Sequence, residues 1–143
     1  MSGLAQRRAR VLRVRQLEHR VASARLATAE AAVANLDRIS GRLAALRASL
    51  RPATDRTDGV TLKAMAEMAI RLEKAQGDLA APINAAAHKR ALSQAERSYA
   101  KSREDGAEKL HGRAVRSETY EQALRADANR PFRKRAPVFG GKS

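Results

Sequence analysis

The chain has 143 residues, of which 31% are charged and only 3% are aromatic, and its formal net charge is +14. Two tyrosines, two phenylalanines and no tryptophan cannot fill a thick core, and the remaining composition favours long helices, so we expect an all-α protein. The absence of cysteine excludes disulfides and thiolate metal sites. No uncharged apolar run approaches the ~18 residues of a membrane-spanning helix, so we expect a cytoplasmic protein.

The first segment carries the pattern of one long helix. Apolar or small residues recur with a mean period of about 3.6 residues, the repeat of a straight helix with weak supercoil. They are Val14, Leu17, Val21, Ala24, Thr28, Ala32, Leu36, Ile39, Leu43, Leu46 and Leu50. We therefore expect a helix over residues 3–51. Its Arg-rich start is also typical of an organelle transit peptide, but Leu4 and Val11 continue the stripe back through it and favour the helix.

Turn-forming residues follow the first helix. Pro52 lacks the amide hydrogen that a helix interior requires, and Gly59 allows left-handed backbone angles. We expect a hairpin turn over residues 52–60. Asp58 or Thr61 can cap the next helix by accepting a hydrogen bond from a first-turn amide.

The second helix is expected over residues 61–128, with a kink near Pro82. Its stripe is Leu62, Met65, Ala69, Leu72, Gln76, Leu79, Ile83 and Ala86, then Leu92, Ala95, Tyr99, Gly106, Leu110, Ala114, Ser117, Tyr120 and Leu124. The part after Ala86 offers little apolar area, so the tightest packing is expected near the turn. Residues 129–143 combine Pro, Gly and basic residues, which predicts a disordered tail.

Positive charge is concentrated at the two ends of the chain. Residues 1–25 hold seven arginines and one glutamate, and residues 129–143 hold five basic residues and no acidic one. A two-helix hairpin brings both ends together. We therefore expect a basic tip whose partner is anionic, whether a protein, a nucleic acid or a membrane surface.

No arrangement of residues indicates catalysis, a metal site or a cofactor. His19, His88 and His111 are isolated and are expected at the surface in contact with solvent. The acidic cluster Glu104, Asp105 and Glu108 is interspersed with lysine and arginine, as on an exposed helix face. Tyr99 and Tyr120 lie 21 residues apart, close to six helical turns, and are expected to pack between the helices. We conclude that the chain is not an enzyme.

Three features together are typical of one protein family: two long helices joined by a polar turn, the pattern Gly59-Val60-Thr61 followed by Leu72-Glu73-Lys74-Ala75, and the Arg/Glu/Ala-rich run over residues 95–126. In these the chain resembles the FliJ family of flagellar type III export proteins and, more distantly, the stalk proteins of injectisomes. The resemblance implies an antiparallel coiled-coil hairpin, peripheral at the membrane export apparatus. It implies three partners: the export ATPase ring, the membrane export gate and export chaperones.

Two sets of residues are the candidate partner sites. The basic tip offers Arg7, Arg8, Arg10, Arg13, Arg133 and Arg135 to the ATPase ring. The resemblance places gate contacts at Met68, Leu72, Ala75 and Leu79. The main alternative is a basic helical hairpin that binds nucleic acid or the ribosome, although the nearly balanced middle of the chain and the lack of an aromatic platform oppose it. A helical anchor on anionic lipid is the third possibility.

Overall fold

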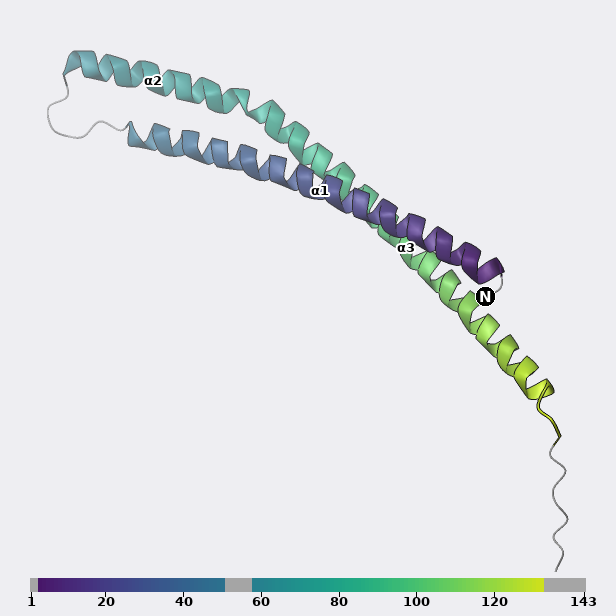
Figure 1. The fold of residues 1–143 in the computed structure, drawn as a ribbon. Coiled ribbons are helices and arrows are strands. Elements are labelled where there is room, and N and C mark those ends of the chain that lie inside the picture. Colours follow the sequence, from purple (N-terminus) through teal and green to yellow (C-terminus); the bar gives the residue numbers. More distant parts are fainter. Residues whose placement is uncertain (1–2, 51–57, 133–143) are drawn as a thin grey trace, which may run out of the picture.

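A computed structural model describes residues 3–50 and 58–132. Helix α1 spans Gly3–Ser49, α2 spans Gly59–Asp78 and α3 spans Ala80–Ala128. Helix α1 runs antiparallel to the continuous arm that α2 and α3 form together (Figure 1). The described residues hold no strand, and the predicted all-α hairpin is confirmed.

The helix ends lie close to the predicted turn. Helix α1 ends at Ser49, three residues before Pro52. The residue before a proline disfavours helical backbone angles, so a helix usually ends at or before that residue. Asp58 occupies the N-cap position of α2 with extended backbone angles, but its side chain makes no capping hydrogen bond. Thr61 lies within α2, so side-chain capping by either residue was wrong. Residues 51–57 of the predicted turn lie outside the described residues.

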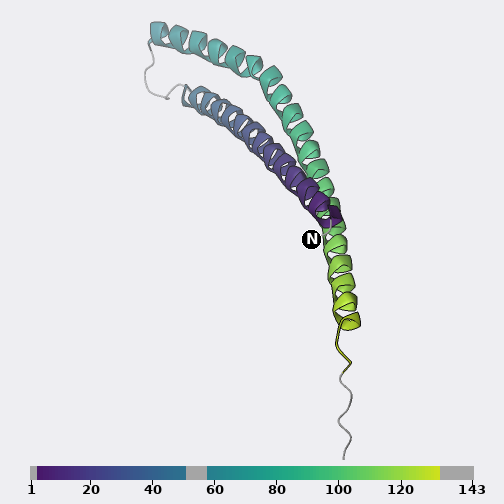
Figure 2. The ribbon, with the colours of Figure 1, turned by 45° about the vertical axis from the view of Figure 1, so that its right-hand side comes forward.

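The second arm bends where α2 meets α3, as Figures 1 and 2 show. Leu79, between the two helices, keeps near-helical angles of φ −79° and ψ −17°. Its amide donates to the carbonyls of Ala75 and Gln76 at 3.2 and 3.3 Å. Pro82 follows three residues later, and a proline ring crowds the carbonyl four residues before it, here that of Asp78, the last residue of α2. The arm therefore kinks without losing its helical course.

The seam, by which we mean the contact between α1 and the α2–α3 arm, follows a seven-residue repeat. Along α1, buried or half-buried residues recur in two series, Ala5, Leu12, His19, Leu26 and Val33, and Ala22, Ala29, Leu36, Leu43 and Leu50. Along the other arm they include Leu72, Leu79, Ala86, Ser93, Ala100, Ala107 and Ala114. The mean spacing is thus about 3.5 residues per turn, not the predicted 3.6.

The predicted stripe was therefore wrong over half of the hairpin. It holds for Leu36 and Leu43 in α1, for Leu50 just after it, and for Met65 to Ala86 and Ala114 in the other arm. At most other positions it named the residue just before the true seam residue, as with Val21 before Ala22 and Tyr99 before Ala100. The larger side chain of each pair points outward, and Tyr99 and Tyr120 are 64% and 67% exposed instead of packed between the helices.

Burial is not concentrated near the turn, contrary to the expectation. Of the nine buried residues in the described part, eight lie within Ala5–Ala29 or Ser93–Ala114, and only Leu72 lies in the turn-side half. Six of the nine are alanines. A seam of alanines lets two helix backbones approach closely, because no bulky side chain separates them.

The end of α3 extends past the start of α1 (Figures 1 and 2). Residues 119–128 are all exposed, so this last part of α3 has no helix packed against it in the described structure. In the same described residues, no helix is long and apolar enough to cross a bilayer.

Candidate functional site

The start of α1 presents the predicted arginines at the open end of the hairpin. Arg7, Arg10 and Arg13 are exposed, whereas Arg8 is half-buried beside the seam. Arg10 and Arg13 line a shallow surface groove of about 290 Å³ together with Gln6 and Ala9. Among the described residues, no ion pair joins any of these four arginines to a carboxylate. Three unneutralised guanidinium groups therefore face solvent on the first turns of α1.

The basic surface is interrupted by an ion pair at the next turn of α1. Arg15 donates two hydrogen bonds to Glu18, at 2.8 and 3.1 Å. This hydrogen bonding from Arg15 lowers the pKa of Glu18 below its ordinary value, and Arg15 and Arg103 add to the shift by charge attraction. Arg15 is thus locally neutralised, in contrast to the exposed arginines at residues 7–13.

Only one of the two predicted halves of the basic tip lies within the described residues. Arg133 and Arg135 lie outside the described residues. The exposed end of α3 that leads to them carries Arg125, Glu121 and Asp127, and Arg130 lies 4.0 Å from Asp127. The described part of this end is therefore close to neutral, and the start of α1 is the stronger candidate for an electrostatic contact.

The four candidate gate residues do not share one exposed face. Leu72 is buried and Leu79 half-buried in the seven-residue series that faces α1. Met68 is 46% exposed and Ala75 is half-buried, and they lie seven residues apart on the side of the helix next to that series. Met68 is thus the residue of this set that offers most surface to a partner.

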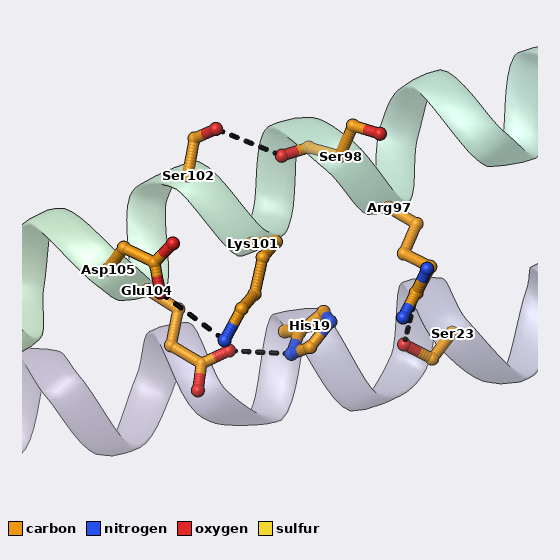
Figure 3. A network of polar contacts seen from close by, with 8 residues as sticks. All are labelled: His19, Ser23, Arg97, Ser98, Lys101, Ser102, Glu104 and Asp105. Carbon is orange, nitrogen blue, oxygen red and sulfur yellow. Dashed lines mark hydrogen bonds and ion pairs between the residues drawn. The ribbon is translucent and has the colours of Figure 1, made fainter.

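A polar cluster that the sequence did not predict lies within the seam (Figure 3). Nδ1 of His19 in α1 lies 2.6 Å from Oε2 of Glu104 in α3, and the two side chains are only 20% and 15% exposed. One turn away, Arg97 donates to Ser23 across the seam at 3.3 Å. Lys101 pairs with Asp105 of the same helix at 3.3 Å, and this contact raises the pKa of Lys101. The cluster fixes the register of α1 against α3.

These contacts correct two predictions about polar residues. His19 and His111 are half-buried, and only His88 is exposed as expected. Nε2 of His19 and Nδ1 of His111 are buried and have no hydrogen-bond partner in the described structure. Glu104 belongs to the seam and not to an exposed acidic face. The seven-residue repeat would have found all three residues, because His19 continues the series of Leu12 and Leu26, and Glu104 and His111 lie seven residues apart.

The described residues hold no group of three or more His, Cys, Asp or Glu side chains that could bind a metal ion. The grooves found among them are open and shallow, and they lie along the helices. No family model, curated protein or solved structure matches the chain.

Proposed function

We propose that this chain is a coiled-coil stalk of the flagellar type III export apparatus, which links the export ATPase ring to the membrane export gate and handles export chaperones. The observation that carries the proposal is the set of exposed, unpaired arginines Arg7, Arg10 and Arg13 at the open end of a narrow helical hairpin. A thin arm with a basic end suits insertion into a ring with an acidic lining, because charge complementarity speeds and orients docking.

The seam supports the coiled-coil part of this proposal. A seven-residue repeat keeps the contact surface on the same side of two helices that wind around each other. It extends from Ala5, near the start of α1, to Leu50, just after its end. Cross-seam polar contacts at His19 and Ser23 specify one register. A long arm of fixed register transmits a rotation or a tilt from one end to the other, as a stalk requires.

The proposed gate contact lies near the bend at Leu79. Met68 lies on the turn side of the bend, on α2, and is exposed. The hairpin would thus meet the ATPase ring with the start of α1 and the gate with α2. These two sites lie at opposite ends of α1, a helix of about 70 Å at 1.5 Å per residue.

The test is binding of the purified chain to the hexameric export ATPase across a salt series, followed by fluorescence anisotropy. The variant Arg7→Gln/Arg10→Gln/Arg13→Gln removes the three exposed charges and leaves half-buried Arg8 in place. We expect it to bind about tenfold more weakly, with a shallower salt dependence. The matched control Arg38→Gln/Arg42→Gln/Arg71→Gln removes three exposed arginines elsewhere and is expected to bind within about twofold of the parent.

The same proteins distinguish the nucleic-acid alternative. In a filter-binding assay with RNA and duplex DNA, a stalk protein is expected to bind weakly, and both triple variants should lose similar affinity because each loses three phosphate contacts. Tight and steeply salt-dependent binding of nucleic acid, together with no ATPase binding, would overturn the proposed function.

A further inference from the structure

One face of the hairpin carries a run of large apolar side chains that are 41–64% exposed in the described structure. On α1 it includes Val21, just before the seam residue Ala22, and Val14, seven residues earlier. On α3 it includes Leu92 and Tyr99, which precede Ser93 and Ala100 in the same way. We name these four residues, with Val11 and Leu110, the apolar face.

The two helices contribute to one continuous surface. Val21, Ala24 and Thr28 of α1 line the same groove of about 650 Å³ as Leu92 of α3. Val14 lies seven residues before Val21, and Tyr99 lies seven residues after Leu92. Because the seam itself repeats every seven residues, positions separated by seven stay on the same side of it. The line of apolar residues therefore continues beyond the groove towards the open end of the hairpin.

The seven-residue spacing on both walls determines the shape of the occupant. A third α-helix that lies along the groove, with apolar residues at alternating steps of three and four, places one side chain against each Val or Leu layer. An extended peptide would present its side chains with a period of two and would match only some layers. The surface therefore fits an amphipathic helix.

The charged residues beside the groove indicate which net charge a bound helix should carry. Arg25 and Lys89 line it and are exposed, and Arg103 lies over the ring of Tyr99 at 5.4 Å. Of the two carboxylates on this side, Glu18 is already held by Arg15, which leaves Glu96. A second copy of this chain would bring the same basic surface against itself, whereas an acidic helix would neutralise it.

We infer that the apolar face is the docking site of an amphipathic, acidic partner helix. This helix would pack beside the two arms of the hairpin as a third helix. Val11 lies between Arg10 and Arg13, but the groove at Val21 and Leu92 includes none of the arginines at residues 7–13, so variants in the groove test the inference separately from the ATPase contact.

The test uses the full chain and two synthetic helices of about 21 residues, three heptads each. Both carry leucine at the core positions, and they differ only in having glutamate or lysine at the flanking positions. We expect the glutamate helix to bind at least tenfold more tightly in a fluorescence titration at low salt. Equal affinity of the two helices, or no binding of the glutamate helix, would overturn the inference.

Paired variants of the chain locate the site. Val21→Gln/Leu92→Gln changes two exposed residues of the groove, 44% and 53% exposed, so the hairpin should keep its helical circular dichroism. The matched control Leu17→Gln/Ile70→Gln changes two exposed apolar residues off this face. We expect at least tenfold weaker peptide binding for the first pair and less than twofold for the second. Equal losses of peptide affinity in the two pairs would contradict the assignment. Sedimentation equilibrium provides a second check: if the parent chain self-associates and the first pair abolishes this, the occupant is a second copy of the chain and the assignment is contradicted.

Discussion

Truncation of two leucines in α1 separates the seven-residue seam from the stripe of period 3.6. Leu26 is 7% exposed and lies in the seam series, whereas Leu17 is 61% exposed and belongs to the stripe that points outward. Each is a leucine in the middle of the same helix, so Leu26→Ala and Leu17→Ala change the same atoms and the same helix propensity. Any difference between their free energies of unfolding therefore reports burial.

The magnitudes follow from these exposures. A buried Leu→Ala change costs about 2–5 kcal/mol, the transfer energy of the lost atoms plus a cavity term. A two-helix seam closes partly around the gap, so we expect about 2–3 kcal/mol for Leu26→Ala. Leu17 is mostly in water already, and Leu17→Ala should change stability by less than about 0.5 kcal/mol.

The assay is urea unfolding followed by circular dichroism at a wavelength that reports helix. Free energies come from linear extrapolation, after the transition has been shown to be two-state. A cost for Leu17→Ala equal to or larger than that for Leu26→Ala would refute the seven-residue seam, and with it the assignment of the apolar face.

Three further changes test other parts of the structure. His19→Leu should destabilise the fold by about 1–3 kcal/mol, because it leaves the Glu104 carboxylate in the seam without its histidine partner. The double variant His19→Leu/Glu104→Leu should recover at least the parental stability. A double-mutant cycle from thermal unfolding in which the two effects simply add would contradict the pair. Gly41→Ala and Gly106→Ala should each stabilise by about 0.5–1 kcal/mol in urea titrations, because a Cβ atom meets nothing within 4 Å at either position, and destabilisation would mean that these sites are crowded. Arg15 lowers the pKa of Glu18 in the folded state, so the contribution of this carboxylate to stability is present above its ordinary pKa of 4.5 and is lost as the pH falls through the lower folded pKa. On acidification from neutral pH, Arg15→Gln should therefore lose less stability than the parent. Identical profiles of stability against pH, measured by circular dichroism, would exclude the effect.

The features that local sequence determines could be predicted. Pro52 marks the end of the first helix through backbone chemistry alone, and Pro82 marks the bend because its ring acts on the preceding turn of its own helix. The prediction for Gly59 was wrong, because this residue is the first of α2 and not part of the turn. The extent of each helix follows from composition and from the lack of other breakers. None of these features depends on which residues of the partner helix lie opposite.

The seam could not be assigned from hydrophobicity alone, because both helices carry two neighbouring stripes. At Val21-Ala22 and at Leu92-Ser93, the larger residue is the more hydrophobic, yet the smaller one faces the partner helix. Close approach of the backbones is possible only with small residues between them, and that condition involves both helices at once. The same reason hid His19 and Glu104, since each is polar and becomes a seam residue only through its partner.

The most direct test of the proposed stalk is cross-linking from the start of α1 in cells of the organism that makes the chain. A photoreactive amino acid replaces Gln6, which is exposed and lies in the groove beside Arg10 and Arg13. Adducts are then identified by mass spectrometry. We predict that the main adduct is the export ATPase and that it disappears in the Arg7→Gln/Arg10→Gln/Arg13→Gln background. Adducts to ribosomal proteins or nucleic acid, with none to the ATPase, would contradict the proposed function.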